Sequence, residues 1–318
     1  MSHNRKCFWA ALLLFGVVTS ASADVVTIGS TRNTTIFGNN VNNSDGGAVI
    51  MFSGTDGNAS VKRALVEFDV ASNVPAGSTI TSVQLTLYLG QVAGMLTTGT
   101  ETIGLHLLTA SWGEGTNGTG DPISGEGQGF PAHDGDATWA NRFYSSTSPV
   151  PWTTAGGDFV STSSAETIVG AITNTGYIWL STPALVSDVQ GWVDNPSSNF
   201  GWLLQNTDEV STRTFRAFFT REENPSSLQP QLQITFTPPP QTPALTLETL
   251  SSGQLQITAT NLVAGLTNYL QTSTDISSPA SWVSVQTNVA ASNSMVFTGL
   301  SPTNVPDQFY RLIELPQQ

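Results

Sequence analysis

The sequence predicts an all-β protein, and three observations carry this prediction. Glycine, threonine, serine and asparagine dominate the composition, and only 10% of the residues are charged. No stretch longer than about ten residues keeps the 3.6-residue period of an amphipathic helix. Several short runs instead alternate between apolar and polar residues, as a strand with one buried face does. Glycine-rich turns between these runs favour an antiparallel sandwich of jelly-roll type.

The first 23 residues have the features of a secretory signal peptide. Arg5 and Lys6 precede an apolar stretch at residues 8–18, and residues 21–23 (ASA) provide a small-residue cleavage pattern. The apolar stretch is too short to span a bilayer comfortably, so no membrane span is expected. The mature chain would then begin at Asp24 and be secreted, either free outside the cell or held at its surface.

Removal of this peptide changes the chemistry available to the chain. The single cysteine, Cys7, lies within the peptide, so the mature chain would contain no disulfide and no thiolate metal site. It would keep 8 basic against 23 acidic residues, a net charge of −15. Such acidity argues against nucleic-acid binding through phosphate neutralisation. An anionic ligand would need a local arginine cluster or a bridging cation.

The clearest predicted strand covers residues 82–89, where Val83, Leu85 and Leu87 alternate with polar neighbours. Further strands are predicted at residues 61–70, 103–108, 201–205, 215–219 and 231–236. One short helix is expected at residues 183–193, because its apolar residues fall on one helical face and the sequence Asp194-Asn-Pro196 would end it.

A proline-rich segment, residues 237–243, marks a domain boundary because its prolines stiffen the chain and cannot donate backbone hydrogen bonds. The predicted organisation is a signal peptide (1–23), a jelly-roll domain (24–236), this linker (237–243) and a second domain (244–318). Six strands are predicted in the second domain, a small fibronectin-like β-sandwich, at residues 245–250, 254–258, 269–273, 282–286, 294–297 and 308–313.

An ordered series of motifs runs through the larger domain. It begins with residues 63–69 (RALVEFD) and 74–89 (VPAGSTITSVQLTLYL), and it continues with 111–115 (SWGEG), 134–139 (DGDATW), 156–159 (GGDF), 189–192 (VQGW), 199–202 (NFGW), 221–222 (RE) and 230–234 (PQLQI). In this order the series resembles the DNRLRE domain family, which is also classed with the family 96 carbohydrate-binding modules. The resemblance covers residues 25–236. Gln229 departs from it, because the family usually has an arginine there.

The resemblance implies a jelly-roll domain that binds polysaccharide, with alginate-like uronic acid polymers as one associated ligand class. It also implies that the domain itself is not an enzyme. The C-terminal residues 269–275, Trp282 and 308–312 resemble a module frequent in secreted proteins of the Verrucomicrobia and related bacteria. That resemblance implies a spacer or attachment role and no particular ligand.

Tryptophans are the first candidates for sugar contacts, since a flat aromatic face can stack on a sugar ring. Trp139, Trp192 and Trp202 lie in apolar surroundings, so core packing is the favoured interpretation for them. Trp152 lies in a loop-like region, residues 149–154, and is the better candidate for ligand binding.

Cationic side chains provide the second group of candidates. Arg213 and Arg216 flank a predicted strand, and a guanidinium can hold a uronate carboxylate in a bidentate contact. Arg142 and His133 complete the predicted ligand-binding set. The alternative interpretation is that these side chains balance surface charge.

Oxygen ligands for a structural Ca²⁺ are a further possibility. Asp134 and Asp136, with Asp121 nearby in sequence, lie in glycine-rich loops and carry the carboxylates that Ca²⁺ prefers. The alternative interpretation is that these aspartates form turns. A bound Ca²⁺ would also bridge an anionic sugar to this acidic protein.

The favoured function is a secreted, non-catalytic carbohydrate-binding protein for an acidic, uronate-containing polysaccharide. The first alternative is a structural protein that contacts cell-surface or matrix proteins and has no glycan ligand. A polysaccharide lyase or hydrolase is the third, because the 23 acidic residues always contain pairs. No pair is singled out, and neither His106 nor His133 has a convincing serine partner.

Overall fold

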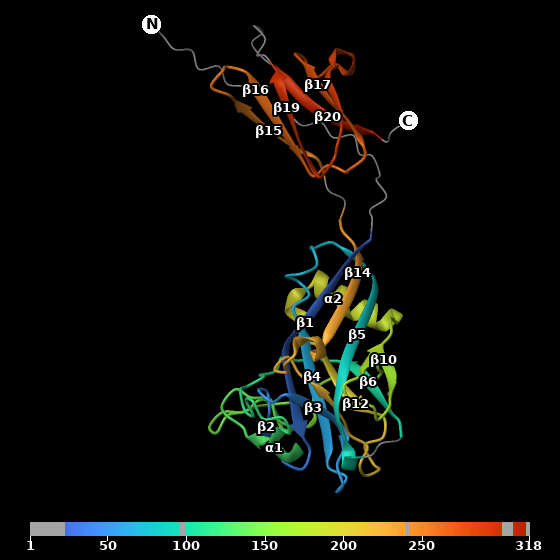
Figure 1. Ribbon diagram of the computed structural model, residues 1–318. Helices are drawn as coiled ribbons and strands as arrows, with labels where there is room; N and C mark the ends of the chain where they lie inside the picture. Colours follow the sequence, from blue (N-terminus) through green and yellow to red (C-terminus); the bar gives the residue numbers. More distant parts are fainter. Residues whose placement is uncertain (1–22, 96–98, 240–241, 301–307, 316–318) are drawn as a thin grey trace. The chain divides into compact units, whose positions relative to one another are not determined.

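The computed structural model describes residues 23–95, 99–239, 242–300 and 308–315 (Figure 1). The predicted signal peptide lies outside the described residues except for Ala23. The chain divides into two compact units, Ser22–Pro239 and Pro240–Gln318, and the division falls within the proline-rich segment 237–243. Both units are built almost entirely of antiparallel strands, which confirms the predicted all-β class.

The larger unit contains the strands that were predicted and several that were not. Its strands are β1 (Asp24–Phe37), β2 (Asn43–Ser44), β3 (Ile50–Thr55), β4 (Val61–Phe68), β5 (Thr79–Val92), β6 (Glu101–Leu107), β7 (Phe130–Pro131), β8 (Asn141–Phe143), β9 (Val150–Pro151), β10 (Ala165–Val169), β11 (Gly176–Trp179), β12 (Trp202–Asn206), β13 (Arg216–Phe219) and β14 (Gln231–Thr237). The helical segments are α1 (Ser124–Gly127), α2 (Pro183–Asp194) and the 3-10 turns Ala93–Met95, Pro196–Ser198 and Ser226–Leu228.

One sheet winds around the larger unit in the order β1-β14-β5-β13-β3-β4-β12-β6-β10, with β11 beside β5. Strand β1 closes it, because residues 24–29 pair with β14 and residues 30–37 pair with β4. The register shifts between Ser30 and Arg32, where β1 crosses from one layer of the sandwich to the other. One layer contains β14, β5 and β11, and the second contains β4, β12, β6 and β10.

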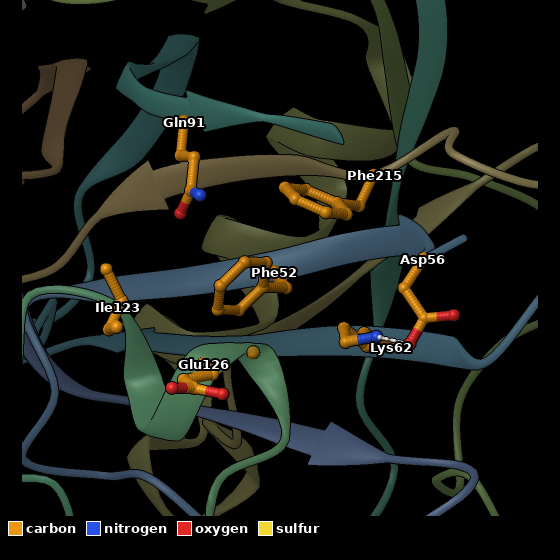
Figure 2. Close-up of a pocket in the computed structure, with 8 residues that line it drawn as sticks. Phe52, Asp56, Lys62, Gln91, Ile123, Glu126 and Phe215 are labelled. Carbon is orange, nitrogen blue, oxygen red and sulfur yellow. Dashed lines mark hydrogen bonds and ion pairs between the residues drawn. The ribbon is translucent and has the colours of Figure 1, made fainter. Parts of the chain in front are cut away.

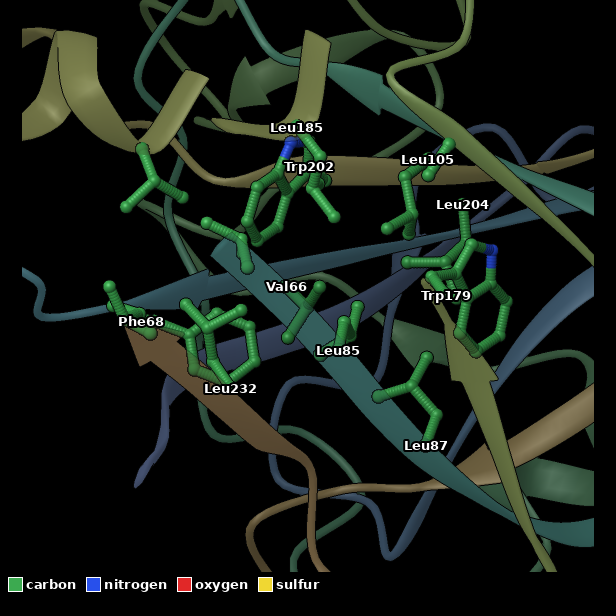
Figure 3. Close-up of a cluster of buried hydrophobic side chains, with 14 of the residues drawn as sticks. Val66, Phe68, Leu85, Leu87, Leu105, Trp179, Leu185, Trp202, Leu204 and Leu232 are labelled. Carbon is green, nitrogen blue, oxygen red and sulfur yellow. The ribbon is translucent and has the colours of Figure 1, made fainter. Parts of the chain in front are cut away.

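The main core lies between the two layers (Figure 3). Alternate residues of β4, β5 and β12 point into it, among them Val66, Leu85 and Trp202. Helix α2 adds its apolar face, the predicted Leu185, Val189 and Trp192, and packs against β5. The helix begins after Thr182, whose hydroxyl accepts a hydrogen bond from the Leu185 N–H at 3.0 Å.

The second layer is also buried on its outer face. Leu65 of β4 and Leu203 of β12 point away from the main core and belong to a separate apolar cluster. Ile36 of β1 and Phe200 also contribute to it, and the rest of this cluster comes from the long connection between β6 and β10, including Trp112 and Trp152. We call this connection, residues 108–160, the cover. The cover is mostly irregular chain with a few short strands, and it packs against the outer face of the sheet.

The smaller unit is a sandwich of two three-stranded sheets, ordered β15-β16-β19 and β18-β17-β20. All six predicted strands are present, and they are β15 (Ala244–Thr249), β16 (Leu255–Thr260), β17 (Thr267–Ser273), β18 (Val283–Val289), β19 (Ser294–Leu300) and β20 (Phe309–Leu315). A 3-10 turn, Pro279–Ser281, precedes β18. Side chains from both sheets, including Ile257, Leu270 and Phe297, form one core.

Candidate functional site

Trp152 does not offer a stacking surface, contrary to the sequence-based expectation. Its side chain is only 4% exposed and lies in the apolar cluster beneath the cover. The indole Nε1 donates a hydrogen bond to the Thr138 carbonyl oxygen at 2.8 Å, so the polar edge of the ring is satisfied inside the protein. Trp152 is therefore a packing residue.

Arg216 is likewise unavailable for a ligand. It is 1% exposed, and its Nε donates to the Gly170 carbonyl oxygen at 2.7 Å while Nη2 donates to that of Gly99 at 3.1 Å. Burial lowers the pKa of the guanidinium, and nearby Glu101 partly offsets this effect. Arg142 is half-buried, and its Nη1 donates to the Ser111 hydroxyl at 3.2 Å.

The three aspartates predicted to hold Ca²⁺ serve as hydrogen-bond acceptors in different turns. Asp136 is buried and accepts hydrogen bonds from the Ser44 hydroxyl, the Asn117 amide and the His133 N–H. Asp134 accepts one from the Ser146 N–H, and Asp121 one from the Ile123 N–H. In the part of the chain that the structure describes, no three His, Cys, Asp or Glu side chains come together as metal ligands. The predicted trio is therefore not a shared site.

His133 is exposed, and its side chain has no hydrogen bond or ion pair in the described part of the chain. Its backbone N–H is the group that the structure uses, at 2.9 Å from Oδ2 of Asp136. His133 therefore contributes to the loop that buries this aspartate. None of the eight residues lining the pocket described next is among the predicted site residues.

A pocket of about 260 Å³ lies on the outer side of β3 and β4 (Figure 2). Strands β3, β4 and β5, the α1 turn and the segment before β13 each contribute side chains to it. Its lining residues are Phe52, Asp56, Lys62, Gln91, Ile123, Glu126, Gly127 and Phe215. The lining thus combines two aromatic rings with carboxylate, amide and ammonium groups.

Phe52 and Lys62 form the buried part of this pocket. The rings of Phe52 and Phe215 meet edge to face, with their centroids 5.1 Å apart. Nζ of Lys62 lies 2.9 Å from Oδ2 of Asp56 and 3.4 Å from the Ser60 carbonyl oxygen. Burial lowers the pKa of Lys62, and the carboxylate of Asp56 opposes this shift. Lys62 is 1% exposed, so it anchors the pocket and does not reach a ligand.

The Asp56 carboxylate is held in its ionised form. Burial favours the neutral form, but hydrogen bonds from Lys62 and from the backbone N–H groups of Asn58 and Ser60 outweigh it, and the pKa is lowered. Asp56 and Lys62 consequently form a neutral pair at one side of the pocket, which leaves Glu126 as the uncompensated charge among the lining residues.

The α1 turn forms a wall of the pocket and has left-handed backbone geometry. Ser124, Gly125, Glu126 and Gly127 have φ angles of 54°, 59°, 59° and 75°, and the Gly127 N–H donates to the Ile123 carbonyl oxygen at 2.8 Å. A left-handed turn costs roughly 1–2 kcal/mol for each residue with a side chain. Such strain persists only where the surroundings hold it, and it is frequent at functional sites.

Asp45 connects this left-handed turn to strand β1. Its carboxylate accepts hydrogen bonds from the Ser124 hydroxyl and, at 2.5 Å, from the Thr35 N–H of β1. Asp45 is fully buried, and burial raises its pKa to about 7, although hydrogen bonds from Ser124, Thr35 and Thr34 oppose the shift. One buried carboxyl group therefore connects the wall of the pocket to the sheet.

Arg213 is the one predicted ligand-binding residue that lies next to the pocket. Its backbone N–H donates to the Asp56 carbonyl oxygen at 2.8 Å, and its side chain lies beside Gly57 and Gly94. It is exposed and has a φ of 63°, unusual for a residue with a side chain. Among the described residues its guanidinium has no hydrogen-bond or ion-pair partner.

The comparisons with known proteins add no family to this description. No protein-family model matches the chain, and a search of curated proteins finds no significant match. Within the described ranges, every helix is too short or too polar to cross a bilayer.

Proposed function

We propose that this chain is a secreted, non-catalytic carbohydrate-binding protein for acidic, uronate-containing polysaccharides. The pocket beside β3 and β4 would receive a sugar ring, and Arg213 would bind its carboxylate. The proposal includes the membership of residues 25–236 in the DNRLRE domain family that the motif series suggests. Extracellular or cell-surface localisation follows from the predicted signal peptide.

The observation that carries the proposal is the guanidinium of Arg213, which has no partner among the described residues of this acidic protein. The remaining described cations are occupied: Arg32 by Glu67, Lys62 by Asp56, Arg63 by Glu209, Arg221 by Glu114, Arg142 by Ser111, Arg216 by backbone carbonyls and Arg311 by Gln271. A free guanidinium presents a planar set of donors that matches a carboxylate. An exposed arginine held in a strained backbone is best explained by a ligand contact.

The pocket chemistry supports a sugar as the ligand. Ligand sites are typically apolar hollows with a few well-placed polar groups. Phe215 offers an aromatic surface at the mouth, while Gln91 and Glu126 offer amide and carboxylate groups for sugar hydroxyls. Because Asp56 and Lys62 neutralise each other, an anionic sugar meets a single opposing carboxylate there, and Arg213 compensates for it.

Arg213→Asn tests the proposal with little disturbance of the fold, because asparagine tolerates left-handed backbone geometry. Affinity gel electrophoresis in polygalacturonate and in alginate should show retardation of the wild type. The variant should bind about ten-fold more weakly, the loss expected for one charge-assisted contact. Arg142→Gln removes the same charge from the same unit and should bind as the wild type does.

Two results would overturn the proposal. One is the absence of retardation of the wild type in both acidic polymers. The other is equal affinity of Arg213→Asn and the wild type. A loss of affinity confined to Arg142→Gln would indicate that the acidic polymer binds at the cover and not at Arg213. Release of unsaturated or reducing sugar ends during the incubation would show that the protein is an enzyme.

A further inference from the structure

Two cavities separate from the pocket adjoin at Ser161, which lines both. The first, of about 540 Å³, lies on the outer face of the layer that contains β12, β6 and β10, and the second, of about 490 Å³, lies on the cover. We call the two adjoining cavities the trough. The volume of each cavity is in the range of ordinary ligand sites. The cover hides the part of this sheet face around Leu203 and leaves the neighbouring part around Gln205 open.

The register of three neighbouring strands places lining residues of the first cavity side by side. Gly104 of β6 pairs with Gln205 of β12 on one side and with Glu166 of β10 on the other. Since Gly104 has no side chain, the side chains of His106 and Ser163 close in over it. A Cβ at that position would lie only 2.9 Å from Nε2 of His106 and 3.3 Å from Cβ of Ser163. His106 and Ser163 therefore cover Gly104, and both line the first cavity together with Gln205 and Glu166.

The trough is lined mainly by hydroxyl and amide groups. Its polar, uncharged lining residues include Thr109, Thr153, Ser161, Thr162, Ser163 and Gln205. Side chains of this kind both donate and accept hydrogen bonds, as sugar hydroxyls do. Phe159 adds an aromatic surface where the second cavity begins, and its ring meets that of His106 edge to face at 5.3 Å.

The charge of the trough excludes an anionic ligand. None of the lining residues is a lysine or an arginine, whereas three are carboxylates. Glu209 pairs with Arg63 at 2.7 Å, but Glu166 and Asp158 have only uncharged donors, the Ser163 hydroxyl and the backbone N–H groups of Thr153 and Thr154. The trough is thus net negative, in contrast to the surroundings of Arg213.

We propose that the trough is a second glycan site, which takes an uncharged polysaccharide chain. This second site goes beyond the acidic-glycan site because it lies on other strands and takes an uncharged ligand in place of an anionic one. The two sites are joined by the β12–β13 connection, which places Glu209 and Val210 in the trough and Arg213 at the pocket. A domain of this kind would link acidic and neutral polymers in one matrix.

Ser161→Met tests the trough, because Ser161 is exposed and lines both cavities, so a longer side chain obstructs their junction without entering the core. The full chain is run in gels that contain galactomannan, hydroxyethyl cellulose or arabinoxylan. We expect retardation of the wild type in at least one gel and about a ten-fold weaker affinity for Ser161→Met. Ser72→Met makes the same change at an exposed turn elsewhere and should bind as the wild type does.

Each variant is also tested against the ligand of the other site, so that the two sites can be distinguished. Arg213→Asn should keep its affinity for the neutral polymer, and Ser161→Met should keep its affinity for polygalacturonate. The trough proposal is overturned when none of the three neutral polymers retards the wild type, or when Ser161→Met binds them as tightly as the wild type. Neither result affects the acidic-glycan proposal, which is measured with the charged polymers alone.

Discussion

The inner and outer faces of one sheet layer in the larger unit are both buried, but they are built differently. On the inner face, Trp202 packs among strand and helix side chains, with the ring of Trp192 at 4.4 Å. On the outer face, Trp152 packs beneath irregular chain and hydrogen-bonds to a backbone carbonyl. Both tryptophans satisfy their indole N–H, because Trp202 donates to the Asp188 carboxylate of helix α2 at 2.8 Å and Trp152 donates to a carbonyl oxygen of the cover itself. The difference shows that regular elements close the inner face, while the outer face is closed by irregular chain that must also satisfy its own backbone groups and the buried carboxylate of Asp136.

Removing one tryptophan from each face tests whether the two faces are energetically separate. Trp202→Ala leaves a large void in the inner core and should lower the free energy of unfolding by about 3–5 kcal/mol. Trp152→Ala should act mainly on the cover, because its contacts lie within and beneath that segment. Urea unfolding followed by circular dichroism measures the first effect, and amide hydrogen exchange over residues 108–160 measures the second. Equal losses of global stability would show that cover and core unfold as one unit.

The pH dependence of stability tests how firmly the cover is attached to the sheet. The buried Asp45 lies at the edge of the cover and has a pKa of about 7. Its pKa is raised above the ordinary value of 3.8, so the stability it contributes is complete below pH 3.8 and is lost as the pH rises through 7. The upper limit of this loss is about 4 kcal/mol, since each pKa unit corresponds to about 1.4 kcal/mol.

Asp45→Asn isolates this contribution, since asparagine is isosteric with the neutral acid and does not ionise. Wild type and variant are compared by urea unfolding between pH 4 and pH 8. We expect the stability of the wild type to fall relative to that of the variant as the pH rises, and hydrogen exchange in the α1 turn to increase. A constant difference across this range would contradict the assignment.

Calcium should have the smallest effect. Because the described carboxylates do not gather into a group of three, Asp121, Asp134 and Asp136 do not lie together as ligands of one ion. We therefore expect the same melting temperature in EGTA and in millimolar CaCl₂, measured by differential scanning fluorimetry. A calcium-dependent rise that Asp136→Asn abolishes would place an ion in the cover, because a ligand stabilises only the state that binds it.

Alternation along strands with one exposed face made part of the fold predictable, although β10 and β11, which also carry exposed residues, were not predicted. The alternation in β5 and the apolar face of α2 both predicted the observed elements, as did all six strands of the smaller unit. Strands β1 and β3 escaped prediction for a physical reason. Strand β1 changes layers at its bulge, and its residues from Asn33 to Phe37 are buried without alternation, as are all six residues of β3. A strand buried on both faces has no period of two in its sequence.

The candidate site was predictable only in part. Arg213 was found because arginines are rare in this chain and their chemistry suits a carboxylate. Its neighbours Asp56, Gln91 and Glu126 come from three distant parts of the sequence and match no motif, so only the folded chain brings them to one pocket. Trp152 and Arg216 were misjudged because their local sequences contain no sign of the segments that bury them.

The sequence by itself determined the fold class, strands with clear alternation such as β5, the end of helix α2 and the scarcity of cations that makes Arg213 informative. These are local or compositional properties, and periodicity and charge record them directly. Tertiary structure alone decided which tryptophans are buried, where the cover lies, and that Gln205 and Glu166 lie on either side of Gly104 at the trough. Burial and cross-strand register depend on contacts between segments that are far apart in the sequence. A local pattern of residues does not show which of these segments come together.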